Sequence, residues 1–239
     1  MRCIDIIASF ELEINKLDDA LNKPVTDDSI YWINQAVMKF VKDRFNGNAP
    51  KRTSYEQNEK RTRDLIHLFV QTSIEPTKIR VPVVEFSGMT PTITYQEVTV
   101  NNTHPEYDIY SYVYPQNLLY VLNEDVIISD LNDEHKKDVS VFECTADNFM
   151  YRIMNSLTDF HYRYHRARPL RVRTKDGFEL LTDKKYKIHQ YTLGYLKVPD
   201  EIKNDDPDRL YEDFEDNIWQ EIVKIAAQMY VENQSDPRY

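Results

Sequence analysis

The chain has 239 residues, a formal net charge of −10 and 41% apolar residues. A chain of this length and apolar content can bury a substantial core in one or two domains, which excludes a disordered tail. Its four glycines are isolated from one another, and this argues against dinucleotide-binding and P-loop chemistry, because phosphate-cradling loops need closely spaced glycines.

The first third of the chain has the apolar periodicity of helices. Apolar residues recur at three- and four-residue steps over 4–21 and again over 30–41, with Pro24 and a run of capping residues between them. Residues 54–57 have the spacing of a capping box and open a third predicted helix, which Pro76 ends. We therefore expect an N-terminal helical domain over residues 1–76.

The middle of the chain changes to the pattern of strands. Residues 78–86 and 90–100 are rich in valine, isoleucine, threonine and tyrosine, with a turn predicted between them. Further strand-like segments follow, and Asp176–Gly177 is a strong signal for a hairpin turn. These patterns predict a β-rich domain over residues 77–200, with a short helix near 147–160.

The last part of the chain combines an acidic loop with a helix. Nine acidic residues lie between Asp200 and Asp216, against two cations. Apolar residues then recur with helical spacing from Ile218 to Met229. We expect residues 201–239 to form this loop and a C-terminal helix, so that the predicted fold class is α+β.

Few residues offer catalytic or metal chemistry. Cys3 and Cys144 are too few for a disulfide framework or a thiolate zinc site, and we expect free thiols, although a single pairing stays open. His161 and His165 are four residues apart and could face one metal on a helix, with Asp159 nearby, but the ligand set is incomplete. No nucleophile elbow or triad context is present. We predict no enzymatic activity, no cofactor and no bound metal.

Two further sequence features bear on metals and membranes. The acidic cluster 204–208 lacks the glycine and the distal glutamate of an EF-hand loop, which favours a solvated loop. Residues 1–5 contain an acid where a signal peptide needs an apolar run, and no stretch approaches the ~20 apolar residues of a membrane span. We expect a soluble protein made in the cytoplasm.

One concentrated basic segment lies within this acidic chain. Between positions 161 and 175 there are five arginines, one lysine and no acid. If residues 170–175 form a strand, alternation directs Leu170 and Val172 toward a core, and it places a row of cations on the other face. That row consists of Arg171, Arg173 and Lys175.

Three interpretations of this segment remain open. The cations could bind DNA phosphates, or they could form a charged edge that prevents strand aggregation. They could also contact the acidic loop of a neighbouring copy, which would account for both charge clusters and is the interpretation we favour. The predicted subunit interface consists of Arg166, Arg168, Arg171, Arg173, Lys175, Asp205, Asp206, Asp208, Glu212 and Asp213.

Several segments carry a family resemblance. In chain order they are DDSIYWINQAVMKFVKDRFNGN, YEQNEKRTRDLIHLF, YPQNLLYVL, YTLGYLKVPDEI and EIVKIAAQMYVENQSDPRY. Together they resemble the head-to-tail connector proteins of tailed phages, and most of all the ring (adaptor) proteins of crAss-like podoviruses. The segments occur in the same order as in that family, whereas residues 78–108 have no counterpart.

The resemblance implies a bundle of N- and C-terminal helices, with the C-terminal helix packed on the helical domain and a β-rich domain between them. It implies a homododecameric ring in the virion, between the portal protein and other ring or tail hub proteins, through which double-stranded DNA passes without sequence-specific binding. It implies no catalysis and no membrane.

Two other functions stay open. One is a monomeric phage accessory or regulatory protein that binds one partner through its tyrosines. The other is a small hydrolase that uses His161 or His165, which would need a concave pocket with a titratable group of shifted pKa.

Overall fold

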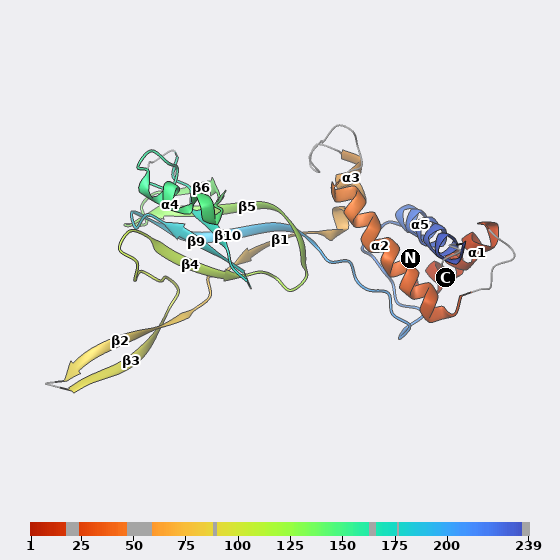
Figure 1. Ribbon diagram of the computed structural model, residues 1–239, viewed down its shortest axis with the longest axis horizontal. Coiled ribbons are helices and arrows are strands. Elements are labelled where there is room, and N and C mark those ends of the chain that lie inside the picture. Colours follow the sequence, from red (N-terminus) through yellow and green to blue (C-terminus); the bar gives the residue numbers. More distant parts are fainter. Residues whose placement is uncertain (18–23, 47–58, 88–89, 163–165, 176, 236–239) are drawn as a thin grey trace. The chain divides into compact units, whose positions relative to one another are not determined.

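The structure, a computed structural model, describes residues 1–17, 24–46, 59–87, 90–162, 166–175 and 177–235 (Figure 1). Over these residues it is a mixed α+β protein, as predicted from the sequence. The chain divides into two compact units. The helical unit comprises Met1–Phe69 and Lys197–Tyr239, and the β unit comprises Val70–Leu196.

The helical unit joins both ends of the chain. Its helices are α1 (Cys3–Leu17), α2 (Thr26–Asn46), α3 (Glu59–Asp64) and α5 (Asp216–Ser235). Helix α5 packs against both α1 and α2. Buried residues on α1 recur at four-residue steps, as an amphipathic helix requires. Aromatic edge contacts close the core, with ring centroids 6.2 Å apart for Phe10 and Tyr230 and 5.9 Å apart for Phe40 and Phe214.

The segment before α5 is tied to the helices through its backbone. The amide of Cys3 donates to the carbonyl of Arg209 at 3.0 Å, and the amide of Tyr211 donates to the carbonyl of Met1 at 3.0 Å. The side chain of Asn34 bonds both the amide and the carbonyl of Ile202, at 2.9 and 3.0 Å. The acidic loop therefore has a fixed path, even though most of its charged side chains are exposed.

Two four-stranded sheets form the body of the β unit. The first has the order β1–β10–β5–β6, with β1 (Phe69–Ile74), β10 (Tyr186–Lys197), β5 (Leu118–Asp130) and β6 (Lys136–Ser140). The second has the order β4–β9–β8–β7, with β4 (Asp108–Val113), β9 (Gly177–Thr182), β8 (Leu170–Arg173) and β7 (Phe142–Glu143).

Aromatic side chains from both sheets share one core. Tyr112 on β4 stacks on Phe178 of β9 with ring centroids 5.1 Å apart, and it contacts Tyr191 of β10 at 5.0 Å. Tyr186 is also fully buried, and its hydroxyl donates to the carbonyl of Phe160 at 3.1 Å. Tyr112, Tyr186 and Tyr191 are therefore core residues rather than surface tyrosines that could bind a partner.

The strands β2 (Ile79–Ser87) and β3 (Thr90–Val98) form a separate hairpin. They pair antiparallel from Ile79 opposite Val98 to Ser87 opposite Thr90, and they join neither four-stranded sheet (Figure 1). Both strands are edges, which accommodates Pro82 and Pro91, because an edge position can lack an amide donor. The strands predicted over 78–86 and 90–100 are thus present.

Two predicted boundaries differ from the structure. The predicted third helix does not continue to Pro76, because Phe69–Ile74 form strand β1 with alternating burial. The capping box that was expected to open this helix lies outside the described residues. Helix α4 (Ala146–Met154) is shorter than the predicted 147–160, and Asn155 follows it in an extended conformation. No helix in the described ranges is both long and apolar enough to cross a membrane.

Candidate functional site: the basic segment and its surroundings

Arg171 is buried between the two sheets of the β unit. Only 3% of its surface is exposed. From β8 its guanidinium bonds Glu124 on β5, in the other sheet, and lies 2.9 Å from an oxygen of Glu143 on β7. The hydroxyl of Tyr191 donates to Glu124 at 2.6 Å. A buried cation thus has its countercharges within the same chain, as burial requires.

The expectation that Arg171 belongs to an exposed row of cations is wrong. Leu170 and Arg171 are both buried, so this end of β8 is covered on both faces. Alternation in the sequence assigned the charged side chain to solvent, but the partner Glu124 is remote in the sequence. Burial opposes the charge of Arg171, yet the two glutamates outweigh it and hold its pKa above the ordinary value.

The exposed end of the same segment is only partly neutralised. Arg173 is 66% exposed, and its guanidinium lies 2.8 Å from the other oxygen of Glu143. Lys175 is exposed as well. Glu143 therefore contacts two arginines that are two residues apart on β8, and it neutralises the charge of Arg173 only in part.

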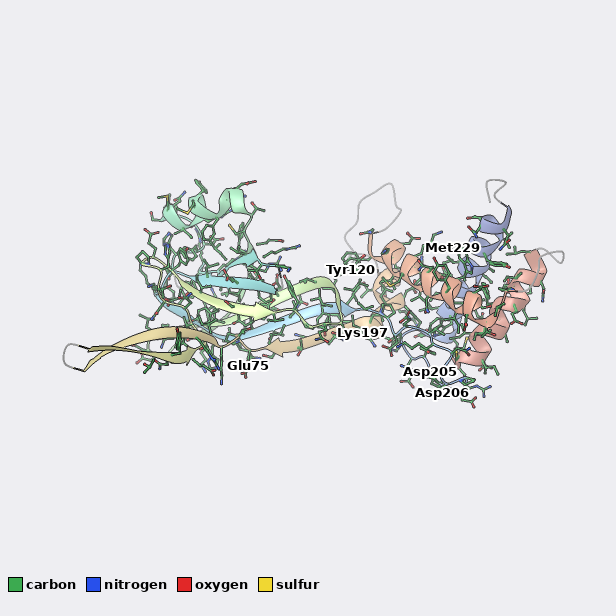
Figure 2. The ribbon with its side chains drawn as sticks, turned by 60° about the horizontal axis from the view of Figure 1, so that its bottom comes forward. Glu75, Tyr120, Lys197, Asp205, Asp206 and Met229 are labelled. Carbon is green, nitrogen blue, oxygen red and sulfur yellow. The ribbon has the colours of Figure 1, made fainter. Side chains whose placement is uncertain are left out.

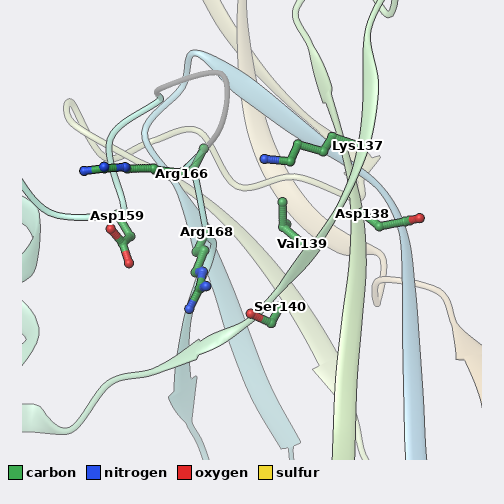
Figure 3. A pocket seen from close by; sticks show the side chains of 8 residues that line it. Lys137, Asp138, Val139, Ser140, Asp159, Arg166 and Arg168 are labelled. Atoms are coloured by element: carbon green, nitrogen blue, oxygen red, sulfur yellow. The ribbon is translucent and has the colours of Figure 1, made fainter.

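A separate cavity of about 420 Å³ lies beside Arg166 and Arg168 (Figure 3). Ala167 between them is buried, whereas Arg166 and Arg168 are both exposed. The amide of Arg168 donates to the carbonyl of Asp159 at 2.7 Å and fixes the segment here. Charged and polar side chains around the cavity are Lys137, Asp138, Ser140, Asp159, Arg166 and Arg168.

The cavity carries a small excess of positive charge. Three of its lining residues are cations and two are acids. Figure 3 shows the Lys137 side chain directed into the cavity, whereas Asp138 points away from it. Within the described residues, no salt bridge joins Arg166 or Arg168 to an acid. The two arginines therefore differ from Arg171 and Arg173, although all four belong to one basic segment.

The acidic loop, like the basic segment, contains both a buried charge with partners and exposed charges. Asp213 is buried and accepts hydrogen bonds from the backbone amide of Asp200 and from the ammonium of Lys197, both at 2.6 Å. It is therefore a structural carboxylate, and its expected place on an exposed interface is wrong. Glu212 is exposed.

Residues 205–208 of this loop are exposed. Asp208 lies 3.5 Å from the guanidinium of Arg2, and its amide donates to Asp206 at 3.1 Å. Figure 2 shows Asp205 and Asp206 at the outer edge of the helical unit, with their side chains directed away from its helices. Neither forms a salt bridge with any residue that the structure describes.

His161 has a hydrogen-bonding role. Its Nε2 lies 2.9 Å from the carbonyl oxygen of Ile153, so this nitrogen carries the proton and donates. Its Nδ1 lies 3.9 Å from Asp183, whose oxygens also accept the amides of Tyr162 and Lys185 at 2.6 and 3.0 Å. With Nε2 occupied, the paired-histidine metal site is not supported at His161, and His165 lies outside the described residues.

A cluster that the sequence did not reveal lies at the turn between β5 and β6. Asp130, Glu134 and His135 bring their ligand-type atoms close together. Asp130 accepts the amide of Glu134 at 2.9 Å and lies 3.2 Å from Nδ1 of His135, and Asp133 has a φ of 60°. These contacts account for the cluster as the closure of a tight turn.

Helix α4 presents an apolar surface that sequence analysis also missed. Ile153 is buried, whereas Met150 and Met154, one turn apart, are 55% and 73% exposed. Tyr151 on the same helix and Leu157 just beyond it are 63% and 73% exposed. The signal in the sequence is a nine-residue helix that has apolar residues on two opposite sides. One of these two sides faces no core. We call these four exposed residues the α4 surface.

The two cysteines are free and buried. Burial raises the pKa of each thiol above its ordinary value, and nearby acids add to this effect at Cys3. Both side chains therefore behave as small apolar core residues.

The chain matches none of the protein-family models with which it was compared, and no curated protein matches it either.

Proposed function

We propose that this chain is a structural subunit of the head-to-tail connector of a tailed phage. In this role, copies of the chain form a ring, expected to be homododecameric, that continues the DNA conduit between the portal and the tail and supports genome retention and ejection. The observation that carries the assembly role is the α4 surface, and the sequence resemblance directs that role to the connector.

The α4 surface supports association for a physical reason. Contiguous exposed apolar surface is costly in water and marks sites of protein contact. Its two methionines add flexible side chains that adapt to a partner's shape. Met150, Tyr151 and Met154 lie on one short helix of the β unit, with Leu157 just beyond it, so a single partner surface could cover all four.

The charge of the chain suits a conduit that must release DNA. At −10 per copy, a ring would carry on the order of a hundred negative charges, which repel phosphates. The salt bridges of Arg171 and Arg173 to glutamates remove part of the basic segment from any DNA-binding role. Double-stranded DNA would then pass without sequence-specific contacts.

The proposed partners are other copies of the chain, the portal protein, and the adjacent ring or tail hub proteins. A monomeric accessory protein would use the same α4 surface to bind one partner. Oligomeric state separates the two functions.

A substitution on α4 tests the assembly role. Met154→Glu places a charge at the most exposed position of the α4 surface and is expected to reduce incorporation into particles severalfold, without lowering the unfolding midpoint. Leu131→Glu is the matched control, because Leu131 is 52% exposed and belongs to the turn between β5 and β6 rather than to α4. Equal incorporation of both variants would contradict a role for α4 in assembly.

A further inference from the structure

Arg166 and Arg168, which line one cavity, form no salt bridge with the acids that the structure describes. The same basic segment supplies Arg171 and Arg173, and each of these has a glutamate within 2.9 Å or closer. The cavity that Arg166 and Arg168 line has a volume of about 420 Å³. The structure thus separates a structural part of the segment from a part that can bind a ligand.

The acidic loop offers matching unpaired charge. Asp205 and Asp206 are adjacent, exposed and directed away from their own unit (Figure 2). The loop that carries them is held in place by its backbone, since the amide of Ile4 donates to the carbonyl of Pro207 at 3.0 Å. A pre-ordered segment loses little conformational freedom on binding, which favours association.

We propose that the cavity binds Asp205 and Asp206 of a neighbouring copy. This inference rests on the proposed function, because it names the contact that would join successive copies in the ring. Arg166 and Arg168 lie on either side of a buried alanine, so their two guanidinium groups can meet two adjacent carboxylates.

The same charges suit a short acidic peptide better than DNA. Tight DNA binding draws on roughly six to ten phosphate contacts along an extended surface. This cavity has three cations, and two acids also line it. The nearest further arginines, Arg171 and Arg173, are already paired with glutamates. Two carboxylates on neighbouring residues therefore match the size and charge of the site.

The contact is head-to-tail, because each copy carries one cavity and one acidic loop. A heterologous contact of this kind generates a ring when its rotation closes. It also makes a sharp test possible, since the two halves of the contact can be disabled in different copies.

The test uses two full-length charge-reversal variants, R166E/R168E and D205R/D206R, and measures masses in solution. Each variant alone is expected to associate on the order of a hundredfold more weakly than the natural chain, because like charges then face each other. An equimolar mixture is expected to form higher oligomers in which the two variants alternate, because every cavity then faces a loop of opposite charge. The chain that carries all four substitutions is expected to regain higher oligomers.

Two controls make the result specific. R173E/K175E applies the same charge change to the same basic segment outside the cavity, and it is expected to leave association within about twofold of the natural chain. Unfolding midpoints of all variants identify any that fail to fold, and recovery in the four-substitution chain shows that the effect comes from the contact.

The outcomes separate this inference from the proposed function. If the natural chain forms rings and both double reversals form them equally well, the contact is wrong and the connector role stands. If R166E/R168E loses only salt-sensitive binding to a duplex DNA, the cavity binds phosphate and the inference is overturned. A natural chain that stays monomeric and is absent from particles overturns the proposed function together with this contact.

Discussion

Arg171 shows how one residue links the two sheets of the β unit. It lies on β8, and its partner Glu124 lies on β5 of the other sheet, where Tyr191 also bonds it. Removing one partner from a buried pair leaves an uncompensated charge, which costs more than the pair itself contributes. The pair therefore matters for stability even though a well-packed apolar replacement could serve as well.

This arrangement predicts unequal effects for two neighbouring arginines. Arg171→Ala is expected to lower the free energy of unfolding by about 3–5 kcal/mol, because it leaves Glu124, whose side chain is only 12% exposed, without its cation. Arg173→Ala, which removes an exposed partner of Glu143, is expected to cost about 0–1 kcal/mol. Urea unfolding at neutral pH measures both values, and equal costs would show that Glu124 is well solvated.

The thiols give a second prediction at this scale. Because burial raises the pKa of Cys3 and Cys144 above the ordinary value, little thiolate exists at neutral pH and access is poor. Native protein at pH 7.5 is expected to react with iodoacetamide far more slowly than unfolded protein, in which both cysteines react. Raising the pH increases the native rate, because thiolate forms as the pH approaches the pKa. Rapid native labelling of either cysteine would contradict its burial.

At the scale of elements, periodicity predicted the helices α1, α2 and α5 and the hairpin of β2 and β3, because each element has one dominant pattern. It failed at β1, where the alternation of Phe69–Ile74 directly follows a helix and was read as its continuation. It also failed at Arg171, because the partner that permits burial is 47 positions away in the sequence. Pairings between distant strands cannot be read from local spacing.

The sequence correctly indicates that glycine has a structural role at position 177, but the structure gives a different reason for it. The sequence assigned it to a hairpin turn with Asp176, which lies outside the described residues. In the structure Gly177 is the first residue of β9 and pairs with Val113 on β4. A Cβ atom there would lie 1.9 Å from the carbonyl oxygen of Tyr112. The successive strands β8 and β9 pair antiparallel here, as the predicted hairpin requires, but it is the close approach of β4, rather than a positive φ, that requires glycine at this position.

Gly177→Ala is expected to cost about 1–3 kcal/mol of stability, because the obstructing atom is backbone and cannot move aside. Gly194 is the comparison, since a Cβ there would meet the side chain of Asn123 at 1.7 Å. Much of the cost of Gly194→Ala is expected to disappear in an Asn123→Ala background, whereas Tyr112→Ala gives no relief at Gly177. Thermal unfolding of the single and double variants measures this, and relief at Gly177 would refute the backbone explanation.

At the scale of the whole molecule, the chain leaves its helical unit once and returns once. The first strand of the β unit, β1, and the last, β10, are neighbours in one sheet. A fragment whose ends are paired in this way needs no further chain to close its sheet. The sequence predicted one helical part and one β-rich part of the chain. It did not predict β1, and the first boundary between the two parts depends on that strand.

Residues 69–197 are therefore expected to fold alone, with a cooperative thermal transition and the near-ultraviolet signal of buried tyrosines such as Tyr112 and Tyr191. Circular dichroism of the fragment and of the full chain measures both properties. A fragment with strand content but no cooperative transition would mean that the β unit depends on the helical unit.

The functional site was only partly predictable from the sequence, because contacts between distant residues cannot be read from local spacing. Local composition identified both charge clusters, and Arg166, Arg168, Asp205 and Asp206 remain exposed and unpaired within the described residues. It could not show that Arg171 and Asp213 are buried with partners of their own. The α4 surface escaped notice because an exposed apolar residue has the same local signature as a buried one.

Electron cryomicroscopy of the head-to-tail junction of the phage particle tests the central claim most directly. The account predicts a closed ring of this chain between portal and tail, with the α4 surface covered and with Arg166 and Arg168 against the 205–206 segment of the next copy. A junction that lacks this chain, or a chain found only as isolated monomers, would contradict the account.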